Sequence, residues 1–242
     1  MNLKKTIDEI TSIRNEENNL SKFMRSLDLP PDHKILDVGC GVGAKLELLQ
    51  SQGFRVTGVD INQAMVAANV AKGLPCLSVD AFNATADCYD VLLMSHVVEH
   101  FQPDVLLKFM NNYLDRLKTG GYLIITTPLA SSSFFEDFDH VRPYHPNGIK
   151  MVFGDNGAQV QYYGQHKIEL FDIWFRRGPF KLYFARGLYF KKYSSLPVKL
   201  NILSAILFRL SLGVIGRTDG WMGLYKKCPA DTETAASSLV SS

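Results

Sequence analysis

Histidines and an acid stand close together where one apolar run of the sequence ends. His96, Glu99 and His100 follow the run YDVLLMS, and His140 comes later in the segment DFDHVRPYHP. If a helical turn begins at His96, the first three side chains lie at i, i+3 and i+4 and share one face. Such a face could bind a metal ion, or a neutral imidazole on it could act as a general base near pH 7.

A glycine-rich run forms the second group of residues with chemical potential. The run DVGCGVG begins at Asp37, and glycines let the backbone approach a ligand closely and adopt positive φ. Asp60 ends the next apolar run, 17 residues after Gly43. A carboxylate at that place can accept hydrogen bonds from both hydroxyls of a ribose. The two features together predict a site for a nucleoside-containing ligand.

The charge of the glycine run bears on which ligand it binds. Gly39, Gly41 and Ala44 satisfy the pattern G-x-G-x-x-A of nicotinamide dinucleotide sites. Asp37 stands two positions before the first glycine, where it would repel a pyrophosphate. S-adenosylmethionine (SAM) carries an ammonium and a sulfonium and no phosphate, so an acidic glycine loop matches its charge. We therefore favour SAM, with Asp37 near its amino acid part.

The elements that position these residues alternate between short apolar runs and helix-like segments from Lys34 onward. Five predicted strands end near Gly39, Asp60, Val79, Ser95 and Thr127. Such alternation is typical of βαβ units and a parallel, doubly wound sheet. Ligands of such sheets bind at the carboxyl ends of the strands, which is where both groups of residues fall.

Five segments of the chain resemble the successive motifs of class I SAM-dependent methyltransferases in order and spacing. These segments are ILDVGCGVG, VTGVD, SVDAF, YDVLLMSHVVEHF and LKTGGYLIITTP, within residues 34–128. The resemblance implies a Rossmann-like, seven-stranded, mostly parallel sheet whose last strand is antiparallel, and WMGLYKK would be that strand. It also implies that SAM is the cofactor.

The resemblance assigns each strand end a part of SAM. Gly39 and Gly41 would line the methionine portion, and Asp60 would hold the ribose. The residues assigned to the adenine side are Ile61, which would pack on the ring, Asp80 near its amino group, Ala81 and Phe82 beside it, and Met94 with Ser95 through their backbone.

The chain also resembles two narrower groups, the O-methyltransferases of ubiquinone biosynthesis and the small-RNA 2′-O-methyltransferases. Both carry an E-x-x-E-H run that binds a divalent metal, and the RNA group adds a later histidine. The resemblance thus implies a metal site of His96, Glu99, His100 and His140, and the histidine in place of the first acid favours an ion softer than magnesium. The alternative is a site without metal, since E-H is widespread in similar methyltransferases that use none. One of His96, His100 and His140 would then be the base.

A further segment after the fifth strand bears on the acceptor. DHVRPYHPNGIKMVF resembles the H-x-R-x-Y-x-P-x-x-L segment that many of these O-methyltransferases place over the substrate cleft. Arg142 and Tyr144 are therefore candidate acceptor contacts, with loop packing as the alternative.

The charge of the chain is unevenly distributed. The 242 residues include 26 Lys plus Arg and 24 Asp plus Glu, a formal charge of +2 that offers no argument for a nucleic acid partner. Residues 1–175 sum to 15 − 21 = −6, and residues 176–242 to 11 − 3 = +8. The basic part interleaves aromatic residues and leads into an apolar helical stripe. It could lie in a membrane interface, receive an anionic sugar, phosphate or nucleic acid, or pack on the domain as a helical insertion. The segment is too small for a large RNA footprint, so we expect no nucleic acid partner.

The domain organisation follows from these segments. We expect an N-terminal helical cap over residues 1–31, a SAM-binding core over 32–175, a basic and apolar insertion over 176–217, the final strand over 218–229 and a disordered tail over 230–242. Four widely spaced cysteines, with no signal peptide and no spanning segment, predict a cytoplasmic protein, with peripheral membrane contact through 176–217 as an option.

The function that these observations favour is O-methylation of a small or lipid-linked hydroxylated acceptor. Two alternatives stay open. One is an NAD-dependent oxidoreductase that uses the G-x-G-x-x-A loop, and the other is a catalytically silent, methyltransferase-like binding module.

Overall fold

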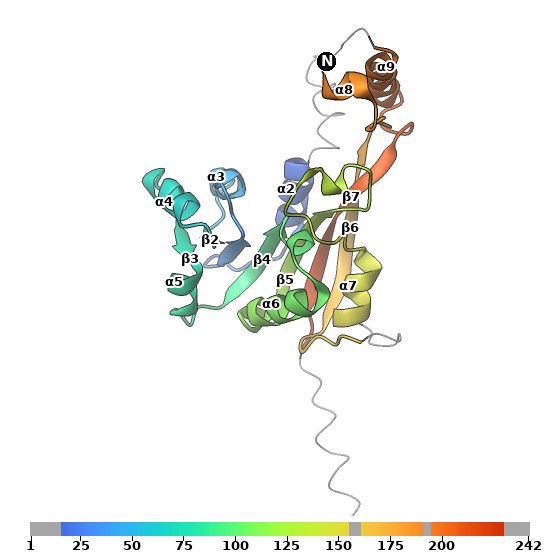
Figure 1. Cartoon of the computed structure of the whole chain (residues 1–242). Helices are drawn as coiled ribbons and strands as arrows, with labels where there is room; N and C mark the ends of the chain where they lie inside the picture. Colours follow the sequence, from blue (N-terminus) through green and yellow to red (C-terminus); the bar gives the residue numbers. More distant parts are fainter. Residues whose placement is uncertain (1–15, 155–160, 191–194, 230–242) are drawn as a thin grey trace, which may run out of the picture.

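The computed structural model describes residues 16–154, 161–190 and 195–229. These residues form an α/β fold around a seven-stranded sheet with the strand order β3-β2-β1-β4-β5-β7-β6 (Figure 1). The strands are β1 (Ile35–Val38), β2 (Val56–Asp60), β3 (Cys76–Ser78), β4 (Tyr89–Ser95), β5 (Leu117–Pro128), β6 (Ile168–Gly178) and β7 (Arg217–Lys227).

The sheet is parallel except for its last strand. β1 pairs in parallel with β2 and β4, β2 with β3, and β4 with β5. β7 lies between β5 and β6 and runs antiparallel to both. The predicted α/β class, the mostly parallel sheet and the antiparallel last strand are confirmed.

The described α-helices are α2 (Glu16–Ser26), α3 (Ala44–Ser51), α4 (Gln63–Ala71), α5 (Val79–Asn83), α6 (Pro103–Asp115), α7 (Pro146–Phe153), α8 (Arg186–Tyr189) and α9 (Leu196–Leu210). Of these, α2, α3, α6 and α7 cover the two faces of the sheet. Because side chains of a strand alternate between faces, Ile35 and Leu36 of β1 enter two different apolar clusters. The cluster with Leu36 is closed by α6 and α7, and the cluster with Ile35 by α2 and α3.

Some bounds differ from those that the sequence predicted. β6 begins at Ile168 and extends to Gly178, three residues beyond the predicted end of the core at 175. β6 is an edge strand with mostly exposed side chains, so burial imposes no clear alternation there. Residues 1–15 of the predicted cap and the predicted tail from 230 to 242 lie outside the described residues.

Residues 179–216 join β6 to β7 and carry α8 and α9, which lie away from the sheet at the top of Figure 1. We call the described part of this stretch the insertion. Within the described ranges, no helix combines the length and hydropathy needed to cross a bilayer.

Candidate active site

A cavity of about 610 Å³ opens at the carboxyl ends of the central strands. Its position agrees with the expectation for a doubly wound sheet. Of the residues predicted to contact the cofactor, Gly39, Asp60, Ile61 and Phe82 line it. Ile61 is 85% exposed, so a large apolar side chain stands ready to cover a flat ring. We call this space the cofactor cavity.

Backbone amides orient the Asp60 carboxylate at the edge of this cavity. The Gly41 amide donates to Oδ2 and the Asn62 amide to Oδ1, both at 2.8 Å. Each oxygen keeps acceptor capacity for a further donor, because a carboxylate oxygen has two lone pairs. The carboxylate is thus fixed in position and still able to accept the hydroxyls of a ribose.

Asp37 lies on β1, next to the strand that ends at Asp60, and its side chain is buried. Its Oδ2 has no hydrogen-bond partner among the described residues. Burial raises the pKa of Asp37 to about 7; Lys45 opposes the rise and the charge of Asp60 adds to it. Buried carboxylate oxygens are normally paired, so this one fits a ligand that brings a cationic donor, such as the SAM ammonium.

Three residues predicted on the adenine side are not among the residues that line the cofactor cavity. The Met94 side chain is buried in the apolar cluster that α6 closes, and the backbone contact predicted for Met94 and Ser95 stays a prediction. Asp80 and Ala81 are exposed on α5 and are not among the residues that line the cofactor cavity, whereas Phe82 and Asn83 are. The α5 helix begins directly after β3, with Ser78 as its N-cap, and this start turns Asp80 and Ala81 outward.

His96 differs from the prediction in its backbone and in its charge. Its φ is +57°, and the following turn is a 3₁₀ helix over Val98–His100, so no α-helical turn begins at His96. Its Nδ1 contacts Oε1 of Glu99 at 3.1 Å, and its Nε2 contacts Oε2 of Glu16 at 3.0 Å. Burial lowers the pKa of His96, but the two carboxylates outweigh it and raise the pKa to about 9. Both ring nitrogens therefore donate at neutral pH, which leaves neither free as a base or metal ligand.

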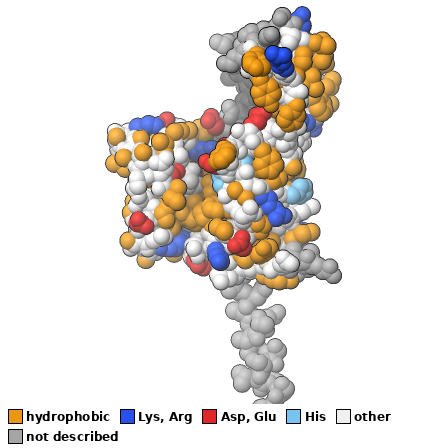
Figure 2. All heavy atoms as spheres, in the orientation of Figure 1, with side chains coloured by type: hydrophobic (Ala, Val, Ile, Leu, Met, Phe, Trp, Pro, Cys, Tyr) orange, Lys and Arg blue, Asp and Glu red, His pale blue; other side chains and the backbone are white. Residues whose placement is uncertain are grey.

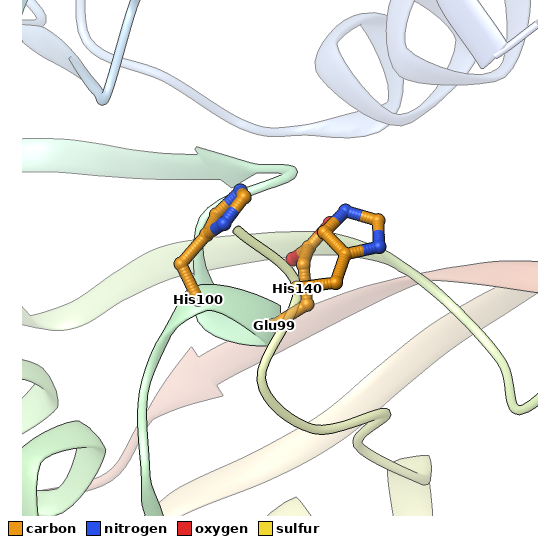
Figure 3. Close-up of side chains that lie close together, drawn as sticks. All are labelled: Glu99, His100 and His140. Atoms are coloured by element: carbon orange, nitrogen blue, oxygen red, sulfur yellow. The ribbon is translucent and has the colours of Figure 1, made fainter. Parts of the chain in front are cut away.

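The remaining three predicted residues come together. Atoms of Glu99, His100 and His140 that could bind a metal all lie within 4.8 Å of one another (Figure 3). His100 donates its Nδ1–H to the Asp139 carbonyl at 3.0 Å, and His140 donates its Nδ1–H to the Phe134 carbonyl at 2.6 Å. Because a carbonyl only accepts, each Nε2 carries the free lone pair of the neutral ring. We call this group the Glu99 cluster.

Glu99 is fully buried at the centre of this cluster. Its Oε2 accepts the Thr127 hydroxyl at 3.0 Å, and its Oε1 lies 4.0 Å from Nε2 of His140. Its backbone carbonyl accepts the amides of Val141 and Arg142, which brings the segment after β5 against the turn after β4. That contact explains how His140, far along the chain, reaches its partners.

A second, smaller cavity of about 160 Å³ also borders His96. His96 and His140 line it together with polar side chains from β6, β7 and the segment after β5, namely Ser131, Ser133, Arg176 and Asp219. Nε of Arg176 donates to Oδ1 of Asp219 at 2.8 Å. We call this space the polar pocket. Since His96 also lines the cofactor cavity, the two spaces adjoin at its ring.

Two residues that the sequence did not single out hold this site together. Glu16, the first residue of α2, contacts His96 and also lies 3.5 Å from Nη1 of Arg176. Asn69 of α4 is fully buried and donates to the carbonyl of Gly41 at 2.8 Å, which fixes the glycine loop. No sequence pattern marks Glu16, because one acid on an amphipathic helix is ordinary. No sequence pattern marks Asn69 either, because it is the only buried residue of α4 and no apolar stripe accompanies it.

The predicted acceptor contacts Arg142 and Tyr144 lie in a different place. Both line a third cavity of about 400 Å³ between α6 and α7, with mainly apolar walls. The Tyr144 hydroxyl donates to the Phe101 carbonyl at 2.9 Å, and the Arg142 guanidinium lies over the Tyr144 ring. Neither residue lines the polar pocket, so their described contacts are those of loop packing.

The strand order and the glycine loop define the class of protein. A dinucleotide-binding sheet has the order 3-2-1-4-5-6, whereas here an antiparallel strand stands between β5 and β6. A family model described as a methyltransferase domain matches residues 12–171. The chain belongs to this family, and the predicted class I SAM-dependent methyltransferase family is confirmed.

Curated relatives and solved structures agree with this assignment. Phosphoethanolamine N-methyltransferase 1 of Zea mays is 28% identical over 143 residues, 53% of this chain and 28% of that protein. Ubiquinone biosynthesis O-methyltransferase of Rickettsia bellii (strain OSU 85-389) is 34% identical over 103 residues, 40% of this chain and 42% of that protein. Each match thus spans less than half of the relative's length.

Among solved structures, a SAM-dependent methyltransferase from Archaeoglobus fulgidus has a TM-score of 0.54 at 21% identity, covering 93% of this chain and 100% of that one. Coclaurine N-methyltransferase bound to N-methylheliamine and SAH has a TM-score of 0.50 at 15% identity, covering 86% and 72%. At these identities the likeness is one of fold.

Proposed function

We propose that the chain transfers the methyl group of SAM to a hydroxyl of a small acceptor bound in the polar pocket. The observation that carries this proposal is the free Nε2 of His140 beside that pocket, next to the cofactor cavity. Methyl transfer from a sulfonium is an in-line displacement, so the protein must align the acceptor oxygen and take up its proton.

The cofactor side of the site fits SAM by charge and shape. Asp37 would accept the ammonium, Asp60 the ribose hydroxyls, and Ile61 would cover the adenine. Gly39 and Gly41 keep their assigned place at the methionine portion, since Gly39 lines the cavity and the Gly41 amide holds the Asp60 carboxylate. Both have positive φ. Asp80, Ala81 and Met94 have no such support.

The acceptor side favours an oxygen nucleophile. A hydroxyl must lose its proton as it attacks, whereas a neutral amine attacks through its own lone pair. His140 offers the base for that proton, and Asp137 at 3.7 Å and Glu99 at 4.0 Å would stabilise the imidazolium that forms. The two curated relatives are named for an N- and an O-methylation, so the base is what favours the oxygen.

The polar pocket also bears on the size of the acceptor. Its volume of about 160 Å³ accommodates a small polar group, and its walls carry hydroxyl, guanidinium and carboxylate groups. A hydroxylated metabolite or the head of a lipid-linked compound fits these walls, while a macromolecular surface would reach it only through a protruding group.

The cofactor assignment is tested by titration with S-adenosylhomocysteine (SAH). We expect Asp60→Ala to weaken SAH binding at least about tenfold, because the variant lacks the carboxylate that would accept both ribose hydroxyls. Asp87→Ala removes an exposed carboxylate that pairs with Lys34 and is the matched control. Equal affinity of the Asp60 variant and wild type would contradict the ribose assignment.

The base is tested by a turnover screen with hydroxylated acceptors. His140→Asn keeps a donor near the Phe134 carbonyl but removes the base, so kcat should fall by about 10²–10⁴ while SAH affinity stays. An unchanged kcat would remove His140 from this role. A protein that binds SAH and methylates nothing would support the silent binding module.

A second candidate mechanism places a divalent metal in the Glu99 cluster. Metal-binding histidines usually donate their other N–H to a carbonyl or carboxylate, as His100 and His140 do. Glu99, His100 and His140 would hold the ion, and it would lower the pKa of the acceptor hydroxyl. His96, predicted as a fourth ligand, is engaged by two carboxylates and is left out.

Elemental analysis of the purified protein tests the metal. This second mechanism predicts that a transition metal such as zinc binds and that His100→Ala loses it, because nitrogen ligands favour such ions over magnesium. His166→Ala changes a histidine that pairs with Asp115 outside the cluster and serves as control. Turnover that is unaffected by a chelator, in a protein without bound metal, would exclude this mechanism.

A further inference from the structure

The insertion exposes an apolar surface that the described part of the fold does not cover. α9 turns Phe208 inward, where it is 8% exposed, and Asn201 of the same helix bonds both backbone groups of Leu182. The other side of α9 carries Leu203, Ile206 and Leu207, each more than two-fifths exposed. This surface lies at the top of Figure 2, where hydrophobic side chains gather over α8 and α9.

Exposed apolar side chains before α8 and at the two ends of α9 add to this surface. Phe184 is 81% exposed, Leu196 68% and Leu210 76%. A group of exposed apolar side chains of this kind marks a binding face. Its chemistry alone does not choose between a lipid surface and a protein.

The charge of the insertion favours a lipid surface over a protein. Residues 176–218 contain nine lysines and arginines and no aspartate or glutamate. Lys181, Lys199 and Arg209 are exposed, and none of them has an ion pair with another described residue. A second copy of the chain would bring like charges together, and a nucleic acid would leave the leucines in water. An anionic lipid surface complements both features.

The length of α9 sets the mode of contact. A helix of 15 residues is about 22 Å long, which is shorter than the roughly 30 Å of hydrocarbon in a bilayer. The helix therefore fits the plane of the interface, with leucines directed inward and the ammonium of Lys199 reaching back to the head groups.

We propose that the insertion docks the protein on anionic bilayers without crossing them. Resting on the proposed function, we further infer that the acceptor is an amphipathic lipid whose hydroxylated head enters the polar pocket. Arg176 and Asp219, which line that pocket, lie on β6 and β7 within three residues of the ends of the insertion. The pocket is thus at the foot of the docking surface.

Co-sedimentation of the full chain with lipid vesicles tests the docking. We expect binding to vesicles of phosphatidylcholine with phosphatidylglycerol, weaker binding as salt rises, and little binding to phosphatidylcholine alone. The double variant Lys199→Glu/Arg209→Glu should bind anionic vesicles at least about tenfold more weakly, since each basic residue near the surface contributes. Leu203→Asp should also lower binding, by loss of apolar contact.

Controls separate docking from misfolding and from the methyltransferase activity. Val70→Asp places the same charge at a 56% exposed apolar position on α4 and should leave vesicle binding unchanged. SAH affinity should be equal in all these variants, so failure of docking and failure of the cofactor site are distinguishable. Wild-type protein that ignores anionic vesicles at low salt would overturn the proposal. So would a wild-type dimer that Leu203→Asp converts to a monomer without any vesicle binding.

A methyl-transfer assay with acceptors in vesicles and in solution tests whether the acceptor is a lipid. We expect methyl transfer to a hydroxylated amphipathic acceptor in anionic vesicles to fall with the Lys199→Glu/Arg209→Glu change, while transfer to a short-chain soluble analogue stays. Equal loss or equal retention for both substrates would overturn the lipid acceptor and leave the activity in place.

Discussion

Asp37 and Asp60 lie on neighbouring strands, yet the protein treats their carboxylates differently. The Asp60 oxygens accept two backbone amides, whereas Oδ2 of Asp37 has no described partner. The charge argument made from the sequence required an acid at position 37, but its burial and its raised pKa could not be read from the glycine pattern. They arise because the strand is covered on both faces.

The raised pKa of Asp37 predicts a pH dependence of cofactor binding. The SAH ammonium would bind the ionised carboxylate of Asp37, whose pKa burial raises to about 7. Below that pH the carboxyl group is protonated in the free protein and must lose its proton when SAH binds. The affinity for SAH should therefore fall as pH drops below about 7, by up to about tenfold per pH unit. Above that pH the affinity should level off. Isothermal titration between about pH 5.5 and 8.5 measures this.

The matched variants make this test specific. Asp37→Asn should bind SAH more weakly than wild type and lose most of the pH dependence, because its side chain does not titrate. Asp32→Asn alters an exposed acid before β1 and should keep the wild-type profile. A pH profile in Asp37→Asn that parallels the wild type would assign the dependence to another group.

At the scale of elements, the parallel strands and their order could be predicted, while the surroundings of the histidines could not. Buried strands such as β4 give continuous apolar runs, and βαβ alternation follows from them. The turn after β4 has a positive φ at His96, and a histidine alone is not enough to predict that conformation from the sequence. The prediction that His96, Glu99 and His100 share one helical face is therefore wrong. His140 joins Glu99 and His100 in the Glu99 cluster instead.

The α2 helix is the other element whose role the sequence left open. The sequence predicted a helical cap here, and Leu20, Phe23 and Met24 of α2 enter the apolar cluster beside α3. Periodicity does not say which end of the sheet the helix approaches. That placement brings Glu16 to His96, a residue 80 positions away.

We expect Glu16→Gln to destabilise the protein. Burial raises the pKa of Glu16, but His96, Lys45 and Arg176 outweigh it and lower the pKa to about 2, below its ordinary 4.5. Replacing the carboxylate leaves His96 and Arg176 without that charge, at a cost of about 1–3 kcal/mol in the free energy of unfolding. Urea denaturation at neutral pH measures it. Glu47→Gln, which breaks an exposed pair with Lys72, should cost under about 1 kcal/mol.

The same variant should show a defined pH window. The lowered pKa of Glu16 contributes stability above pH 4.5 that is lost as pH falls toward 2, and the raised pKa of His96 contributes stability below 6.5 that is lost as pH rises through about 9. The difference between wild type and Glu16→Gln should thus be largest between about pH 4.5 and 6.5. A difference that is constant from acid to pH 10 would show that the pair does not act through these charges.

For the whole molecule, the near-neutral sum of charges conceals two parts with different tasks. The acidic residues 1–175 contain β1 to β5, most of β6 and the cofactor cavity. The basic residues 176–242 contain the insertion, which leaves the sheet between β6 and β7, and β7 itself. The sequence predicted that asymmetry and a helical insertion. It could not predict that the insertion leaves one side of α9 in water, since an apolar stripe is equally typical of a helix that packs on the core.

The two antiparallel strands allow the insertion to be removed without disturbing the sheet. Gly178 of β6 pairs with Arg217 of β7, so residues 179–216 can be replaced by the two-residue turn Asn-Gly that suits a hairpin. We expect the shortened protein to bind SAH within about twofold of wild type, because every residue assigned to the cofactor lies before position 97. Vesicle binding should fall to background, since the basic and apolar surface is gone. Titration with SAH and co-sedimentation on the same preparation measure both.

Two results would contradict this prediction. Loss of SAH binding in a shortened protein that still unfolds cooperatively would mean that the insertion shapes the cofactor cavity. Retained vesicle binding would place the docking surface elsewhere on the molecule.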